Sequence, residues 1–262
     1  VSTLEMQRFS QSDDDFEARV CALTAPMEAL DPNLVRSVRD IIAEVRSRGD
    51  QALLDFTRRF DQHPAESLSE LVFESDTLIA FESQITAAER AAITEAAQRI
   101  RSYHEEQITP DWSITDEHGS QLGQRVRPMR RVGLYVPGGK ASYPSSVLMN
   151  TIPAKVAGVA EVVMVAPTPS GQVNPLVLAA ASLAGVDQVV TVGGAQAVAA
   201  LAYGTESIIA VDKIVGPGNR YVAEAKRQVF GIVGIDMIAG PSEIFVIADG
   251  TVDPDWIALD LM

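Results

Sequence analysis

Four short glycine turns carry the polar side chains of this sequence that could bind one ligand together. Each turn follows a short apolar run, so each delivers a polar side chain at the same relative place. In an open parallel sheet, ligands bind outside the carboxyl ends of the strands, where glycine lets a backbone come close to a phosphate or a ring. One such turn is more often a tight connection, but four together predict a single site. The turns are Pro137-Gly138-Gly139-Lys140, Gly193-Gly194-Ala195-Gln196, Gly216-Pro217-Gly218-Asn219 and Gly240-Pro241-Ser242-Glu243.

These turns do not match the two standard phosphate-binding motifs. A P-loop that ended at Gly139-Lys140 would need glycine at position 134 and Ser or Thr at position 141, where Leu134 and Ala141 stand. The dinucleotide fingerprint that would begin at Gly216 needs glycine or alanine where Tyr221 stands. The site is therefore predicted from the repetition of the turns, without support from either motif.

The sequence contains few residues that could support metal or thiol chemistry. Cys21 is the only cysteine, so an internal disulfide and a thiolate metal site are excluded, and we expect a packing role for it. His63, His104 and His118 lack a second histidine at metal-ligand spacing, which favours surface or packing roles.

Charge and hydropathy narrow the class of partner. The formal charge is −14, and residues 1–126 carry 24 acidic against 12 basic side chains. An acidic chain without a basic stripe would repel a polyphosphate, so we expect no nucleic-acid partner. No apolar run approaches the roughly 20 residues of a membrane span, and the first residues do not resemble a signal peptide, so we expect no membrane partner and a cytoplasmic location.

The first half of the chain is predicted to be helical. Apolar residues recur at helical spacing from Asp31 to Asp61, in two helices behind the Asp31-Pro32 turn. Thr86 and Glu89 form a capping box, which predicts a third helix that runs to about Glu106.

The second half alternates between short apolar runs and alanine-rich helical stretches. Runs that are apolar on both faces suit a parallel sheet covered by helices on each side, so we predict an α/β, Rossmann-like, doubly wound domain. The predicted strands are Val132–Val136, Glu161–Ala166, Gln188–Val192, Ile208–Val211 and Ile244–Ala248. The predicted helices between them are Ser145–Gly158, Pro175–Ala184, Ala195–Ala202 and Arg220–Phe230.

Long strings around the glycine turns resemble the histidinol dehydrogenase family. They are VGLYVPGGKASYPSSVLMNTIPAKVAGV, VTVGGAQAVAALAYGT, VDKIVGPGNRYVAEAKRQVFG and IDMIAGPSEIFVIAD, and the resemblance covers roughly residues 30 to 262. By resemblance, Tyr135, Gln196 and Asn219 would lie at an NAD site, and Ser242 would lie near the substrate. An aromatic ring can pack on a flat base, and an amide can both donate to and accept from cofactor oxygens.

The resemblance also implies an activity. Members of the family oxidise histidinol to histidine through an aldehyde, with two hydride transfers to NAD and with zinc to polarise the substrate oxygen. It further implies a homodimer and a division of this chain into an N-terminal arm (1–30), the helical part of a first α/β domain (31–134), the Rossmann-like domain (135–241) and a return into the first, incomplete domain (242–262).

The family's zinc ligands and its acid/base Glu-His pair are expected beyond Met262. We therefore assign no catalytic and no metal-binding residue within these 262 residues, and expect this stretch alone to be inactive. The helices of residues 31 to 107 would then lack most of the sheet that they cover, which predicts exposed apolar surface. Two alternatives stay open at this point: a related dehydrogenase for another small alcohol, such as a sulfonated diol, and a non-catalytic fragment that binds a dinucleotide.

Overall fold

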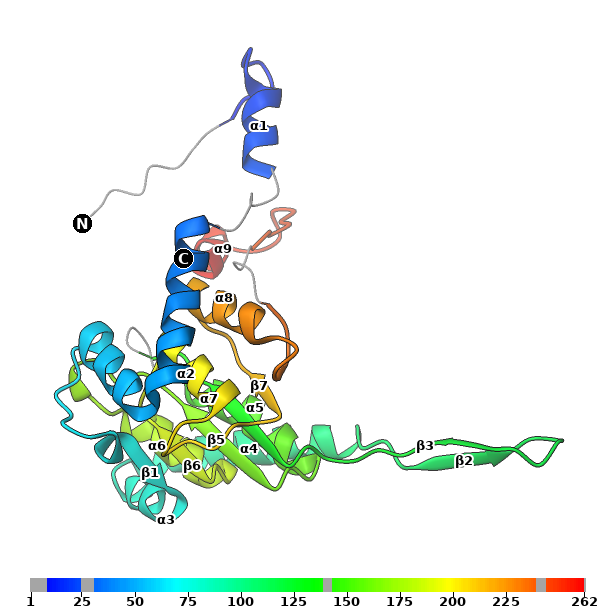
Figure 1. Ribbon diagram of the computed structural model, residues 1–262. Coiled ribbons are helices and arrows are strands. Elements are labelled where there is room, and N and C mark those ends of the chain that lie inside the picture. The colour runs from blue at the N-terminus through cyan, green and yellow to red at the C-terminus, as the bar shows by residue number, and fades with distance from the viewer. Residues whose placement is uncertain (1–8, 25–30, 139–142, 239–243, 262) are drawn as a thin grey trace.

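A six-stranded sheet with the order β1-β6-β5-β4-β7-β8 forms the centre of the computed structural model, which describes residues 9–24, 31–138, 143–238 and 244–261 (Figure 1). Strands β4 to β8 pair in parallel, and β1 joins the edge of β6 in the antiparallel sense. The order β6-β5-β4-β7-β8 is the 3-2-1-4-5 order of the doubly wound dinucleotide-binding fold. The strands are β1 (Val72–Glu74), β4 (Arg131–Tyr135), β5 (Glu161–Val165), β6 (Gln188–Val190), β7 (Lys213–Val215) and β8 (Gly234–Ile235).

Helices cover both faces of this sheet. Helices α5 and α6 connect β4 to β5 and β5 to β6 on one face, and α7 and α8 make the next two connections on the other. The α-helices are α1 (Phe16–Thr24), α2 (Pro32–Asp61), α3 (Ser75–Leu78), α4 (Ala87–Glu105), α5 (Pro144–Val156), α6 (Pro175–Ala184), α7 (Gly194–Tyr203), α8 (Arg220–Val229) and α9 (Pro254–Leu261). Short 3-10 turns η1 (Leu68–Leu71), η2 (Ile79–Ser83) and η3 (Pro169–Gly171) complete the connections. The predicted α/β, doubly wound class is confirmed, and no helix of the described ranges has the length and apolar character to cross a membrane.

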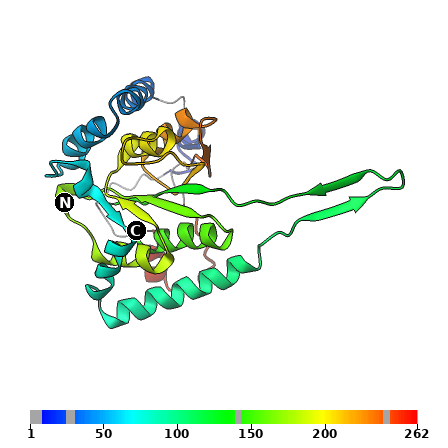
Figure 2. The same cartoon turned by 60° about the horizontal axis from the view of Figure 1, so that its bottom comes forward.

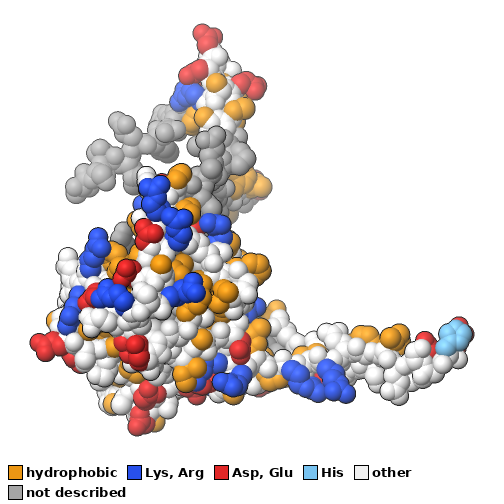
Figure 3. All heavy atoms as spheres, in the orientation of Figure 1, with side chains coloured by type: hydrophobic (Ala, Val, Ile, Leu, Met, Phe, Trp, Pro, Cys, Tyr) orange, Lys and Arg blue, Asp and Glu red, His pale blue; other side chains and the backbone are white. Residues whose placement is uncertain are grey.

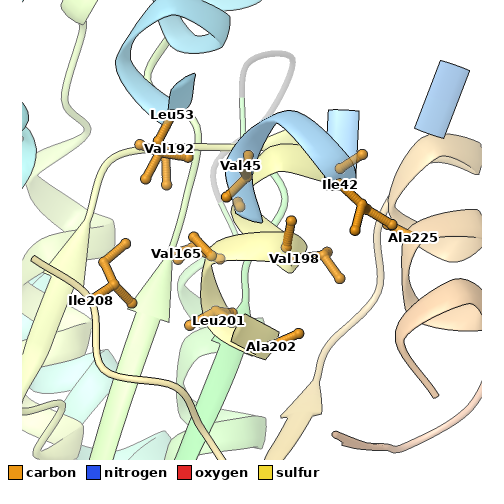
Figure 4. Close-up of a cluster of buried hydrophobic side chains, with 14 of the residues drawn as sticks. Ile42, Val45, Leu53, Val165, Val192, Val198, Leu201, Ala202, Ile208 and Ala225 are labelled. Atoms are coloured by element: carbon orange, nitrogen blue, oxygen red, sulfur yellow. The ribbon is translucent and has the colours of Figure 1, made fainter. Parts of the chain in front are cut away.

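The two faces of the sheet bury separate clusters of side chains. Along β5, Val163 and Val165 point into the cluster under α7 and α8, whereas Val162 and Met164 point into the cluster under α5 and α6. This alternation is the period of two that a strand imposes, and both faces are apolar because both are covered. Figure 4 shows the first cluster, in which side chains from α2, the sheet, α7 and α8 meet.

The helices of the first half pack on those of the second. Helix α2 lies against α7 and α8, and α4 lies against α5 and α6 (Figure 1). The two helices predicted between Asp31 and Asp61 are continuous except at Gly49, whose φ of 53° kinks α2. The capping box of Thr86 and Glu89 is confirmed, with both reciprocal hydrogen bonds present. Helix α2 buries its apolar face here, whereas Ile93 is the one buried residue of α4. Phe60, Ile79 and Tyr103 stay exposed, so part of the exposed apolar surface expected for this region is present. The domain boundaries at residues 134 and 241 stay predictions.

Two of the predicted strands are wrong. Residues Ile208–Val211 form a connection, because the amide of Val211 donates to the carbonyl of Leu201 at the end of α7, and the strand follows at β7. Residues Ile244–Ala248 form no strand, and Phe245 and Ile247 are 88% and 87% exposed.

A two-stranded hairpin was not predicted. Strands β2 (Trp112–Thr115) and β3 (Gln121–Gln124) pair only with each other among the described residues and project from the body (Figure 2). Every residue of both strands is exposed. Figure 3 shows Lys and Arg side chains gathered where the hairpin leaves the body.

Candidate functional site

A cavity of about 820 Å³ lies at the carboxyl edge of the parallel strands. Its sheet-side wall comes from the end of β4 and from the segments after β5, β6 and β7, and α2 supplies the opposite wall. Connections leave β4 and β7 on opposite faces of the sheet, so this edge is the topological switch point where open α/β sheets bind ligands. The volume falls within the roughly 300–1,000 Å³ of small-molecule sites.

Three of the four predicted site residues line this one cavity. Tyr135, Gln196 and Asn219 reach it from the ends of β4, β6 and β7. Gln196 and Asn219 belong to two of the repeated turns, whereas Tyr135 was predicted from the family resemblance. Ser242 lies outside the described residues, as does the rest of its turn. Lys140 of the first turn is also outside them, although Pro137 and Gly138 line the cavity.

Tyr135 is buried and held by one backbone group. Its hydroxyl oxygen accepts a hydrogen bond from the amide of Gly194 at 3.0 Å, which links the ends of β4 and β6. Burial raises the pKa of this hydroxyl to about 12, and the nearby negative charge of Asp61 acts in the same direction. The phenol is therefore neutral at physiological pH and keeps its own proton for an acceptor in the cavity.

Gln196 is only 2% exposed, and it lines the cavity. It lies in the first turn of α7, directly after the Gly193-Gly194 pair. Its side-chain amide has two N–H donors and a carbonyl acceptor that a ligand in the cavity can use.

Asn219 has a structural task besides any binding role. Its side-chain oxygen caps α8 by accepting from the amides of Tyr221 at 2.9 Å and Val222 at 3.2 Å. The expectation that this amide would both donate to and accept from the cofactor is therefore corrected. The oxygen is engaged, and the NH₂ group is the part free to donate.

Two glycines let the strand ends approach each other. A Cβ on Gly216, whose φ is 109°, would lie 2.1 Å from the carbonyl oxygen of Tyr135. A Cβ on Gly138 would lie 2.4 Å from the carbonyl oxygen of Pro167. Any side chain at either position would push the turns apart and change the shape of the cavity wall.

An ion pair between a buried lysine and a partly exposed aspartate, which sequence reasoning missed, fixes the turn that carries Asn219. Lys226 of α8 donates to the carbonyl of Gly216 at 3.0 Å and pairs with Asp236, which itself accepts from the amide of Gly216 at 2.8 Å. Burial alone would raise the pKa of Asp236, but the hydrogen bonds from Lys226 and two backbone amides lower it below its usual value. In the sequence, this ion pair is indicated by Lys226, which falls on the buried face of the amphipathic helix α8.

The α2 wall was also missed by sequence reasoning, and it contains an unusual carboxylate. Asp61 ends α2, and its buried Oδ2 has no hydrogen-bond partner among the described residues. Burial raises the pKa of this carboxyl group. Beside it, the ring of Phe60 is half exposed and stacks on Phe56, with centroids 5.6 Å apart.

The described residues do not fit zinc, because they contain no group of three or more histidine, cysteine, aspartate or glutamate side chains that could hold a metal ion. His63 instead accepts from the amide of Ala65 at 3.1 Å, and burial lowers its pKa. No chemical step is therefore assigned to a metal within this cavity.

The cavity does fit a flat, polar and extended ligand. It has an unpartnered carboxylate oxygen, a side-chain amide from Gln196, a neutral phenol and backbone turns that only glycine permits. Sequence order, sheet order and cavity position together define a doubly wound α/β protein with a ligand site at its topological switch point.

Comparison with known proteins identifies the family. The family model for histidinol dehydrogenase matches residues 26–262. Histidinol dehydrogenases of Pseudomonas aeruginosa and Pseudomonas putida are each 60% identical, over 98% and 100% of this chain and 58% and 59% of their own length. The crystal structure of histidinol dehydrogenase from Elizabethkingia anophelis superposes with a TM-score of 0.81 at 36% identity, over 90% of this chain and 54% of that one. The chain belongs to the histidinol dehydrogenase family and spans somewhat more than half the length of these relatives.

Proposed function

We propose that this chain is the cofactor-binding part of an NAD-dependent dehydrogenase that oxidises L-histidinol to L-histidine, the last step of histidine biosynthesis. The relatives at 60% identity, which are named histidinol dehydrogenases, support the reaction. The observation that carries the cofactor assignment is the convergence of Tyr135, Gln196 and Asn219, from three strand ends, on one cavity.

The overall reaction takes one histidinol, two NAD⁺ and one water to one histidine carboxylate, two NADH and three protons. When bound, NAD accepts the hydride in each of two successive oxidations, from alcohol to aldehyde and from hydrated aldehyde to carboxylate. The cofactor would lie against Tyr135, Gln196 and Asn219, with the glycine turns admitting its pyrophosphate close to the backbone.

Each of the three side chains has a distinct task in this proposal. The neutral hydroxyl of Tyr135 donates one hydrogen bond while it accepts from Gly194. The amide of Gln196 donates and accepts, and the NH₂ group of Asn219 donates. Because Tyr135 and Gln196 are 3% and 2% exposed, they hold the ligand in a place from which bulk water is largely excluded.

Zinc, the acid/base residues, the homodimer and the cytoplasmic location belong to the same proposal and rest on the family alone. Zinc would polarise the substrate oxygen from ligands beyond Met262, and Ser242 would contact the substrate.

Calorimetric titration of NAD into the full chain tests the cofactor site. We expect heat in the wild type and a loss of affinity of at least tenfold in Gln196→Ala and in Asn219→Ala, because each removes a hydrogen-bonding group from the cavity wall. An unchanged isotherm in both variants would contradict the assignment of Gln196 and Asn219 to the cofactor site. Release of two NADH per histidinol, against none with a sulfonated diol, tests the substrate.

A further inference from the structure

The carboxylate of Asp61 has no structural explanation within the described part of the chain. Its Oδ2 is buried on the cavity wall without a hydrogen-bond partner. The neighbouring cations are occupied, since Arg58 donates to the carbonyl of Ala65 at 2.7 Å and Arg59 lies 5.2 Å from the ring of Phe60. An acid at the end of α2 is also disfavoured by the helix dipole. Asp61 therefore costs stability where it stands, which is typical of a group kept for a ligand.

The chemistry of the cavity indicates what kind of ligand would satisfy this carboxylate. The acceptor needs a donor, and the described residues offer too few ligands beside it to hold a metal ion. A vicinal diol supplies two O–H donors at the spacing of the two carboxylate oxygens, and NAD carries two ribose diols. In doubly wound dinucleotide sites, an acidic side chain commonly binds such a diol.

The usual position for that acidic side chain does not serve here. The expected place is roughly 20 residues after the first glycine turn. Glu161 stands near this spacing, but it begins β5 at the opposite edge of the sheet and pairs with Arg131. The segment at the carboxyl end of β5, Ala166-Pro167-Thr168, contains no acid. The site therefore lacks a ribose acceptor of its own from the Rossmann-like strands.

We propose that Asp61, supplied by α2 from outside the Rossmann-like unit, accepts hydrogen bonds from a ribose diol of NAD. This inference rests on the proposed function and adds a recognition residue to it. The half-exposed ring of Phe60 beside Asp61 gives the attached base a flat apolar surface. If the diol is that of the adenosine ribose, a 2′-phosphate would bring a second negative charge against Asp61, and NADP would be rejected.

The test is calorimetric titration of the full chain with NAD, NADP and an NAD analogue that lacks the 2′-hydroxyl of the adenosine ribose. Asp61→Ala and Asp61→Asn are compared with Asp40→Asn, which removes the same charge from the exposed rim of the same cavity. We expect NAD affinity to fall at least tenfold in Asp61→Ala and to stay within twofold in Asp40→Asn. Without ligand, the thermal midpoint of Asp61→Asn should equal or exceed that of the wild type, because an unpaired buried carboxylate has been removed.

The three ligands separate the two ribose diols. If the wild type and Asp61→Ala bind the deoxy analogue equally, and Asp61→Ala also narrows the preference for NAD over NADP, the adenosine ribose is the partner. If Asp61→Ala weakens NAD and the deoxy analogue by the same factor, the nicotinamide ribose is the partner.

The inference and the proposed function fail in different ways. NAD binding that is unchanged in both Asp61 variants but lost in Gln196→Ala overturns the ribose assignment and leaves the cofactor site intact. Absence of NAD binding in the wild type overturns both.

Discussion

At the scale of single residues, Asn219 combines a helix cap with a proposed binding group, and the two can be separated. Aspartate caps helices as well as asparagine, so Asn219→Asp should keep the two hydrogen bonds to α8. It also replaces the free NH₂ donor by an anionic oxygen facing a cofactor that carries phosphates. We expect the free energy of unfolding to stay within about 0.5 kcal/mol of the wild type while NAD affinity falls at least tenfold, as measured by urea unfolding and calorimetry.

Asn219→Ala provides the comparison, since it removes both functions. Loss of the cap should cost about 1 kcal/mol of stability in addition to the loss of affinity. If Asn219→Asp binds NAD as tightly as the wild type, the free NH₂ group has no part in recognition, and Asn219 is a helix cap only.

At the scale of elements, the turn between β7 and α8 depends on Lys226 and Asp236. Lys226→Met keeps most of the aliphatic bulk but removes the cation from a partly exposed carboxylate and the hydrogen bond to the carbonyl of Gly216, so we expect a loss of about 1–2 kcal/mol in stability at neutral pH. The pKa of Asp236 is lowered in the folded state, so the pair contributes its stability above the ordinary value of 3.8 and loses it as the pH falls through the folded pKa. The difference between the wild type and Lys226→Met should therefore narrow below about pH 4, as followed by urea unfolding at a series of pH values.

Lys155→Met is the matched control for this prediction. Lys155 pairs with Asp187 at 2.6 Å and is not among the residues that line the cavity. Both variants lose an ion pair, but only Lys226→Met should also weaken NAD binding, because only Lys226 holds the turn that carries Asn219. Equal NAD affinities in the two variants would contradict a positioning role for Lys226.

The sequence predicted the elements best where local and tertiary signals agree. The helices α6 and α7 and the strand β5 follow from the spacing of apolar residues and from the glycines that flank them. The capping box of α4 follows from the Thr86 and Glu89 pair. The run at Ile208–Val211 failed because a buried apolar connection has the same pattern as a strand. The α2 wall could not be predicted from spacing, because Asp61 and Tyr135 come together only when α2 packs across α7 and α8.

At the scale of the whole molecule, the β2–β3 hairpin is separable from the body that contains the cavity. Trp112, Ile114 and Leu122 are all more than half exposed, and Asp111 closes the base by accepting from Val126 at 2.7 Å. Replacing residues 112–124 by a short glycine linker should change the stability of the body by no more than about 0.5 kcal/mol and leave NAD affinity unchanged. Urea unfolding and calorimetry check this, and sedimentation of the same samples tests whether the proposed homodimer needs the hairpin.

The separation of cofactor binding from metal chemistry is the broadest prediction of this arrangement. The proposed cofactor contacts are hydrogen bonds that a phenol and two amides donate and that one carboxylate accepts, and the described residues offer no group able to hold a metal beside them. Removal of divalent metal from the full chain with a chelator should therefore change NAD affinity less than twofold, while any zinc-dependent oxidation of histidinol disappears and returns when zinc is restored. The heat of NAD binding could instead vanish with the chelator and return with zinc. The metal would then have to lie in the cofactor cavity itself, and the proposed separation of the cofactor site from the zinc ligands expected beyond Met262 would be wrong.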